Sequence, residues 1–145
     1  MIELENAFKK GEIDVLGLSE IRREGKQWLK RHNGNIFYHY GLTKGYRGVG
    51  FYINKRLANQ IIEIKGKSER IATLKLKLSP KQILTIIQVY VPTLAAPTEE
   101  TNEFHHQLDE WLSDECSEVN IVMGDFNAKI GAREGRRFRC EPGNI

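Results

Sequence analysis

The feature that most constrains the fold is a series of short apolar segments separated by turn residues. Residues 71–78 form an apolar segment in which leucine alternates with lysine from Leu74 to Leu78. A turn follows at Pro80 and Lys81, and residues 83–91 form a second apolar segment. Because successive side chains of a strand point to opposite faces of a sheet, this alternation predicts a strand with one face on a core. Segments 36–40, 48–53 and 61–64 continue the series, so we expect mainly antiparallel strands, with 36–40 and 48–53 forming a hairpin.

Helical periodicity occurs at two places. Residues 2–8 predict a short amphipathic helix, and residues 98–116 predict a long one that begins at Thr98 as N-cap. Glu99 and Glu100 follow in its first turn, where negative charge suits the helix dipole. The expected buried stripe of the long helix consists of Phe104, Leu108, Trp111 and Leu112.

Three remaining segments complete the expected pattern. Residues 13–18 and 119–123 predict buried strands, whereas the polar residues 22–33 predict a short helix or an ordered loop. The chain of 145 residues is 40% hydrophobic and 28% charged, which is the composition of one globular α/β domain. We therefore treat residues 1–145 as a single, partial domain.

The cellular location is predicted from the sequence near Met1, from the length of the apolar segments and from the spacing of the two cysteines. Met1 is followed by acidic residues rather than by a basic and then an apolar segment, which excludes an ordinary secretory signal, and no apolar segment is long enough to cross a bilayer. Cys116 and Cys140 lack metal-site spacing and are expected to be free thiols. We expect an intracellular protein.

The charge of the chain gives only weak information about its partners. A net charge of +3 does not by itself indicate nucleic acid. Basic residues nevertheless gather in two runs, each of which follows a candidate site: Arg22, Arg23, Lys26, Lys30 and Arg31, and then Lys129, Arg133, Arg136, Arg137 and Arg139. These runs fit either a polyanionic substrate or a solvated surface.

Polar residues follow two of the expected strands at the point where each ends. Glu20 comes after the first strand, and Gly124-Asp125-Phe126-Asn127 comes after the last. In layered α/β folds ligands bind at strand ends, so these positions are candidate site residues. The alternatives are a solvated loop residue for Glu20 and an Asx-type turn for the second motif.

Five short motifs together resemble the endonuclease/exonuclease/phosphatase superfamily, which includes abasic-site endonucleases and DNase I. They are Leu18-Ser19-Glu20, Gly48-Val49-Gly50, Glu69-Arg70-Ile71, Val89-Tyr90-Val91-Pro92 and Gly124-Asp125-Phe126-Asn127. The amino-acid sequences of residues 17–23 and 123–131 most resemble those of the endonuclease domains of LINE-type non-LTR retrotransposons and of host proteins of the craniofacial development protein 2 type. This resemblance implies a DNase I-like layered α/β sandwich of two mainly antiparallel sheets flanked by helices.

The resemblance also implies roles for individual residues. Glu20 corresponds to the metal-binding glutamate, with Mg²⁺ as cofactor and Mn²⁺ as the alternative. Asp125 corresponds to the aspartate that orients or deprotonates the attacking water, Asn127 to its partner at the phosphate, and Tyr90 to the tyrosine that reaches the scissile phosphate. Without the resemblance, Tyr90 would be taken for a half-buried strand tyrosine.

Two further residues, Arg70 and Tyr46, correspond to family positions that lie near the phosphates of the DNA backbone. They are candidate substrate contacts. Arg70 fits a structural ion pair equally well. The chain departs from abasic-site enzymes at Thr93, where they have asparagine, so specificity for abasic sites is not implied.

Both ends of the family's catalytic site lack a counterpart here. The family opens with a strand that carries a metal-binding asparagine or aspartate, and it ends with a serine-aspartate-histidine element. The four histidines of this chain all precede Asp125, namely His32, His39, His105 and His106. We therefore expect a fold truncated at both ends and little activity from this chain alone.

The expected function is Mg²⁺-dependent nicking of DNA, which in a retroelement supplies the primer for reverse transcription. The alternative is a catalytically inactive remnant with weak nucleic-acid binding. DNA is the expected partner and the nucleus the expected location, with no membrane and no obligate protein partner inferred.

Overall fold

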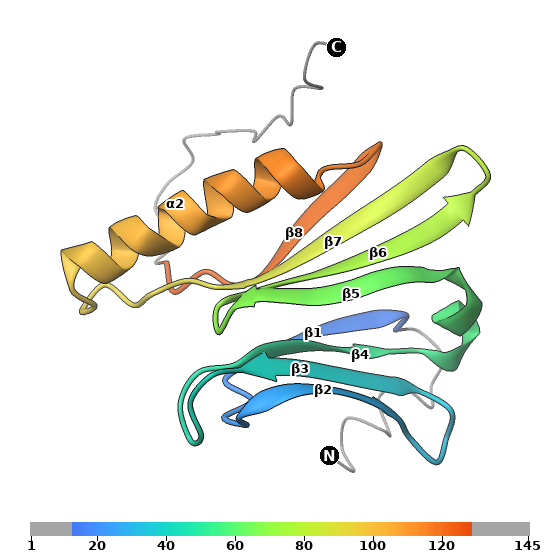
Figure 1. The fold of residues 1–145 in the computed structure, drawn as a ribbon, viewed down its shortest axis with the longest axis horizontal. Coiled ribbons are helices and arrows are strands. Elements are labelled where there is room, and N and C mark those ends of the chain that lie inside the picture. The colour runs from blue at the N-terminus through green and yellow to red at the C-terminus, as the bar shows by residue number, and fades with distance from the viewer. Residues whose placement is uncertain (1–12, 129–145) are drawn as a thin grey trace.

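The structure is a computed structural model that describes residues 13–128. Within this range two four-stranded sheets pack face to face (Figure 1). The first sheet is antiparallel in the order β1-β4-β3-β2. Its strands are β1 (Val15–Ser19), β2 (Gly25–Lys30), β3 (Ile36–Gly41) and β4 (Val49–Ile53). The expected hairpin of residues 36–40 and 48–53 is confirmed as the β3–β4 pair.

A short 3-10 helix, η1 (Lys55–Gln60), leads from the first sheet into the second. The second sheet has the order β5-β6-β7-β8. Its strands are β5 (Ile61–Ser68), β6 (Ile71–Ser79), β7 (Gln82–Tyr90) and β8 (Val119–Asp125). The first three are antiparallel, whereas β8 runs parallel to β7 and is reached through the helix α2 (Thr98–Glu115).

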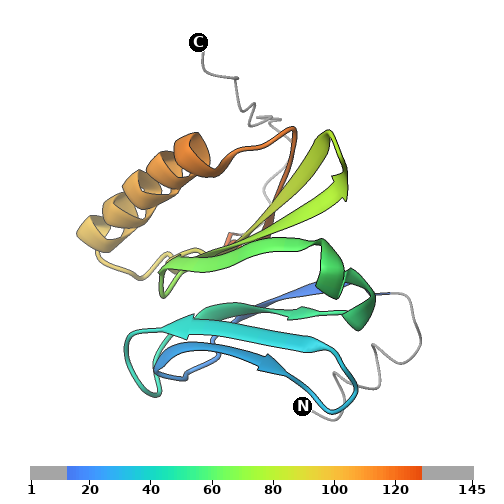
Figure 2. The ribbon, with the colours of Figure 1, turned by 45° about the vertical axis from the view of Figure 1, so that its right-hand side comes forward.

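The helix α2 covers the face of the second sheet that points away from the first (Figure 2). Phe104 and Trp111 of the helix pack with Ile71, Ile87 and Val89 of the sheet, which confirms the predicted buried stripe. Among residues 13–128, no helix is both long enough and apolar enough to cross a membrane.

A second core fills the space between the two sheets. Its buried members come from β3, β4, β6 and β7: Ile36, Tyr38, Val49, Phe51, Ile53, Ala72, Leu74, Leu76 and Ile86. The alternation predicted for β6 explains how this strand serves both cores. Leu74 and Leu76 face the first sheet, whereas Thr73 faces the helix, where its hydroxyl accepts a hydrogen bond from the indole N–H of Trp111.

The layered two-sheet architecture confirms the predicted fold class. One element was predicted wrongly, because residues 25–30 form the edge strand β2 rather than a helix or loop. Most of β2 is exposed, so it lacks the apolar periodicity that identifies the buried strands. The helix predicted at residues 2–8 lies outside the described residues.

Two predictions at the ends of α2 are also corrected. Pro97, not Thr98, is the N-cap, and its carbonyl accepts the N–H of Thr101 at 3.2 Å. Cys116, at the C-cap, is disulfide-bonded, so the prediction of a free thiol there is wrong. Cys140 lies outside the described residues.

Candidate active site

The first part of the site is the loop that follows β1. Glu20 and Arg22 both have left-handed backbone conformations, with φ of 53° and 58°. Three backbone hydrogen bonds hold this loop against the turn before β4, from Ile21 N to Gly48 O at 3.2 Å, from Arg22 N to Arg47 O at 2.7 Å and from Gly45 N to Arg22 O at 3.0 Å. These bonds fix a conformation that non-glycine residues rarely adopt, and so they orient the Glu20 side chain.

The Glu20 carboxylate is held from two sides. The Tyr90 hydroxyl donates to Oε1 and the Arg22 guanidinium donates to Oε2, both at 2.8 Å. The hydrogen bond from Tyr90, and then that from Arg22, lower the pKa of Glu20 below its usual range. Glu20 is therefore a carboxylate at neutral pH, and its side chain is 47% exposed.

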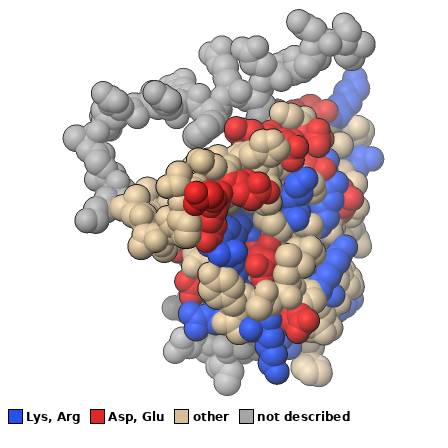
Figure 3. Space-filling model, turned by 60° about the vertical axis from the view of Figure 1, so that its left-hand side comes forward, with Lys and Arg blue, Asp and Glu red and all other residues tan. Residues whose placement is uncertain are grey.

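A cavity of about 270 Å³ lies beside Glu20, and we call it the arginine cavity. It is lined by Glu20, Arg22, Gly45, Tyr46, Arg47, Arg70 and Tyr90. Figure 3 looks onto this end of the molecule, where acidic side chains gather over the start of α2 and basic side chains lie directly beneath them. The cavity thus joins three guanidinium groups to a carboxylate and two phenols.

Tyr90 ends β7 and is held by Arg70 at three points. The backbone N–H of Tyr90 donates to Arg70 O at 2.8 Å, Arg70 Nη1 donates to Tyr90 O at 3.0 Å, and the guanidinium lies 4.8 Å from the ring centroid. Partial burial, followed by the hydrogen bond to Glu20, raises the pKa of the Tyr90 hydroxyl. The hydroxyl therefore keeps its proton near neutral pH and remains a donor.

Two arginines of the cavity share one acid from α2. Glu100 Oε1 accepts a hydrogen bond from Arg47 at 2.6 Å and another from Arg70. Arg47 also donates to the Tyr46 hydroxyl at 3.0 Å. The ion pair that the sequence left open for Arg70 is therefore present, and a phosphate contact would have to use the face of Arg70 that lines the cavity.

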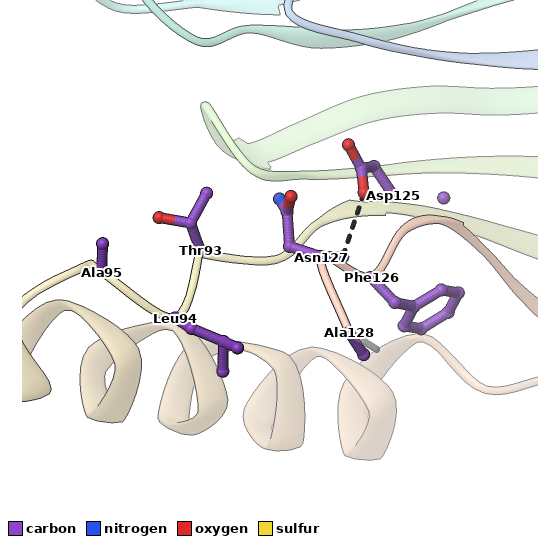
Figure 4. A pocket seen from close by; sticks show the side chains of 8 residues that line it. Thr93, Leu94, Ala95, Asp125, Phe126, Asn127 and Ala128 are labelled. Atoms are coloured by element: carbon purple, nitrogen blue, oxygen red, sulfur yellow. Dashed lines mark hydrogen bonds between the residues drawn. The ribbon is translucent and has the colours of Figure 1, made fainter. Parts of the chain in front are cut away.

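The second part of the site is the loop after β8, at a cavity of about 690 Å³ that we call the aspartate cavity. Its lining includes Thr93, Leu94, Gly124, Asp125, Phe126 and Asn127. In Figure 4 the side chains of Thr93, Asp125 and Asn127 point to the same side of the two loops. The Asx-type turn is present, since Asn127 N donates to Asp125 Oδ1 at 3.0 Å.

Asn127 holds this loop against the end of β7. It has a φ of 44°, and its side-chain amide donates to Val91 O at 2.7 Å, while Val91 N donates to Asp125 O at 2.8 Å. Gly124 has a φ of 147°, and a Cβ atom there would lie 1.9 Å from Val89 O. Only glycine therefore lets β8 approach β7 closely enough to place Asp125 at this edge.

Tyr90, which lines the arginine cavity, lies beside Asp125, which lines the aspartate cavity. Tyr90 and Asp125 are register partners in the parallel β7–β8 pair, and the charge of Asp125 contributes to the raised pKa of Tyr90. The structure thus brings Glu20, Tyr90 and Asp125 to one edge, with Arg70 and Tyr46 beside Glu20. It places Asp125 and Asn127 in the aspartate cavity, whose lining includes neither Glu20 nor Tyr90.

The residues present fit a magnesium ion that takes most of its ligands from water and substrate. Among the described residues no three His, Cys, Asp or Glu side chains gather as a metal cluster. Mg²⁺, however, is commonly held by one or two carboxylates plus substrate phosphate, and Glu20 offers an exposed, ionised carboxylate at the mouth of a basic cavity.

Three residues of this arrangement were not predicted as site residues. Arg22 and Arg47 line the arginine cavity, and Glu100 lies behind it. Arg22 was visible only as part of a basic run, and Glu100 only as an acid suited to the helix dipole. Their contacts join positions up to 53 residues apart, which local sequence patterns do not reveal.

Comparison with known proteins agrees with the motifs of this site. Residues 1–145 match the Endonuclease/Exonuclease/phosphatase family. The chain belongs to this family. It is 34% identical over 123 residues to craniofacial development protein 2 of Bos taurus and, to the same extent, of Tragulus javanicus. Each match covers 84% of this chain and 21% of the relative, so the chain spans about a fifth of these relatives.

This membership confirms the resemblance predicted from the five motifs. Members of this family are generally hydrolytic phosphodiesterases, and a divalent metal ion is their common cofactor. The second basic run, residues 129–139, lies outside the described residues.

Proposed function

We propose that this member of the Endonuclease/Exonuclease/phosphatase family contributes to a Mg²⁺-dependent active site that nicks DNA. The observation that carries the proposal is the position of Tyr90, which donates to Glu20 at 2.8 Å and pairs in register with Asp125. The side chains that would hold a metal, a phosphate and a water therefore lie side by side, Glu20 at the end of β1 in the first sheet and Tyr90 and Asp125 at the ends of β7 and β8 in the second.

Glu20 is the residue that would hold the metal ion. When bound there, Mg²⁺ supplies positive charge that neutralises the phosphate under attack, and Mn²⁺ is the alternative cofactor. The Tyr90 hydroxyl, which stays protonated, is positioned to donate to a phosphate oxygen that approaches Glu20.

Asp125 and Asn127 would act on the other side of the phosphate. Asp125 uses one carboxylate oxygen in the turn with Asn127 N, which fixes the group that aligns or deprotonates water. Asn127 holds the loop through Val91 O, so its contribution is to fix this geometry. In-line attack needs the nucleophile opposite the leaving oxygen, so Asp125 would align water on one side of the phosphate and Tyr90 would donate to it from the neighbouring strand.

DNA is the proposed substrate because the arginine cavity offers Arg22, Arg70 and Tyr46 to a polyanion. The amino-acid sequences of residues 17–23 and 123–131 further support an origin in a retroelement, where the nick would prime reverse transcription. A nuclear location follows from that substrate and belongs to the same proposal.

The test is Mg²⁺-dependent nicking of supercoiled plasmid by the full native polypeptide that contains this sequence. The proposal expects nicking that EDTA abolishes and that Glu20→Gln reduces at limiting Mg²⁺. Plasmid binding without nicking at any Mg²⁺ or Mn²⁺ concentration would refute it in favour of the inactive alternative.

A further inference from the structure

We infer that Glu100 is a positioning residue that closes a ring of hydrogen bonds around the arginine cavity, an inference that rests on the proposed function of that cavity. The side chain of Glu100 does not line the cavity. It lies in the first turn of α2, on the far side of Arg47 and Arg70, and therefore acts through these two arginines.

One half of the ring joins Glu100 to Glu20. Arg47 donates from its side chain to Glu100 at 2.6 Å, and its backbone carbonyl accepts the N–H of Arg22 at 2.7 Å. Arg22 in turn donates from its side chain to Glu20 at 2.8 Å. The loop that presents Glu20 is therefore attached to α2 through the turn that contains Arg47.

The other half joins Glu100 to Tyr90. Arg70 donates to Glu100 with one nitrogen and to Tyr90 O at 3.0 Å with another, and it covers the phenol ring. The ring of contacts closes where the Tyr90 hydroxyl donates to Glu20 at 2.8 Å. The positions of Glu20 and Tyr90 thus both depend on the same carboxylate.

Charge makes Glu100 necessary for this arrangement. The side chains of Arg47 and Arg70 are 22% and 12% exposed, so water screens them poorly from each other. Glu69 lies 3.8 Å from Arg47 and offsets part of its charge, but without the Glu100 carboxylate the two arginines would lose the acceptor that they share. We expect them to separate, which would move Tyr90 and the Glu20 loop apart.

The test is Glu100→Gln in the full native polypeptide, with Glu99→Gln as the matched control. Glu99 is the preceding residue, is exposed, and loses the same charge from the same helix turn. For plasmid nicking we expect Glu100→Gln to lower kcat about 10-fold to 100-fold with KM changed less than threefold, since misplacement of reacting groups acts on the chemical step. Glu100→Asp, which keeps the charge, should recover part of the loss.

A second measurement is independent of activity. In protein labelled with ¹³C in its tyrosine rings, the Tyr90 resonance is identified by its loss in Tyr90→Phe. We expect Glu100→Gln to shift this resonance and Glu99→Gln to leave it in place, both variants keeping the thermal unfolding of a folded protein.

The two measurements separate the inference from the proposed function. If the unmutated protein does not nick DNA but the Tyr90 resonance shifts in Glu100→Gln alone, the proposed function fails and the ring stands. An unmoved Tyr90 resonance in folded Glu100→Gln would overturn the inference. In a protein that does nick DNA, equal nicking by Glu100→Gln and Glu99→Gln would overturn it as well.

Discussion

The two ends of α2 carry the same feature, a glutamate that binds two cations. At the start of the helix Glu100 binds Arg47 and Arg70, and at its end Glu115 binds Lys65 at 2.6 Å and Lys75 at 2.7 Å. The cations differ in where they stand. Arg47 and Arg70 lie in turns at the cavity edge, whereas Lys65 and Lys75 lie within β5 and β6.

This difference shows that one kind of ion pair serves two purposes according to its place in the fold. At the Glu115 end the lysines project from regular strands, and Lys65 also lies 5.2 Å from the ring of Trp111. That cluster holds the helix on the sheet. At the Glu100 end the partners carry the turns that shape the arginine cavity, so we expect changes there to alter function more than stability.

The largest effect is expected at the functional edge, from Asp125→Asn. Asparagine keeps an oxygen that can accept from Asn127 N, so the loop should persist, whereas general base help worth about 10²-fold to 10⁴-fold should be lost. Plasmid nicking and near-ultraviolet circular dichroism measure the two properties. Asp109→Asn on α2 is the control, and nicking by Asp125→Asn at the control rate would remove Asp125 from the chemistry.

A pair of glycine substitutions compares the two cavities directly. Gly124→Ala places a Cβ atom against Val89 O at a φ of 147°, and we expect a loss of about 3 kcal/mol in the free energy of unfolding. Gly45→Ala has open space and a φ of 79°, so about 1 kcal/mol is expected. Urea unfolding measures both, and equal losses would contradict the close β7–β8 approach.

Glu115→Gln tests the other end of the helix. Its carboxylate is 7% exposed but its lysines are partly exposed, so we expect a loss of about 2 kcal/mol, below the 3–5 kcal/mol typical of a fully buried pair. Nicking per folded molecule should stay unchanged. Glu103→Gln, on the exposed face of α2, controls for the charge, and a fall in kcat for Glu115→Gln would show that both ends serve the site.

The smallest effect is expected from pH. Burial raises the pKa of Glu115, but the hydrogen bonds and charges of Lys65 and Lys75 outweigh it, so the net pKa is lowered. The unfolded chain therefore takes up this proton first, and the stabilisation present above the ordinary glutamate pKa is lost as the pH falls through the folded one. The free energy of unfolding of Glu115→Gln should accordingly fall less steeply with decreasing pH than that of the unmutated protein. Parallel curves of this free energy against pH for the two proteins would contradict the prediction.

The predictable parts of this molecule are those that local sequence determines. The end of β1 could be placed before Glu20 because its apolar segment stops where polar residues begin, and the end of β7 could be placed to within one residue because Pro92 follows. The Asx-type turn at Asp125 and Asn127 could be considered from the sequence because its hydrogen bond joins residues only two positions apart.

The parts that escaped prediction depend on distant partners or on exposure. The strand β2 pairs only with β3 among the described residues and exposes most of its side chains, so nothing in its own residues distinguishes it from a loop. Glu100 looks in sequence like any acid of a first helical turn. Its role depends on contacts with Arg47 and Arg70, which lie in turns between other strands and far from Glu100 in the sequence.

The parallel pairing of β7 and β8 has a practical consequence for labelling the protein. Since both strands end at the site, the turn between β6 and β7 lies at the opposite end of the sheet (Figure 1). The nine residues of β7, about 30 Å of extended chain, separate that turn from Tyr90. The exposed residues Pro80 and Lys81 are therefore the place to insert an affinity tag or attach a fluorophore while leaving the reacting edge untouched.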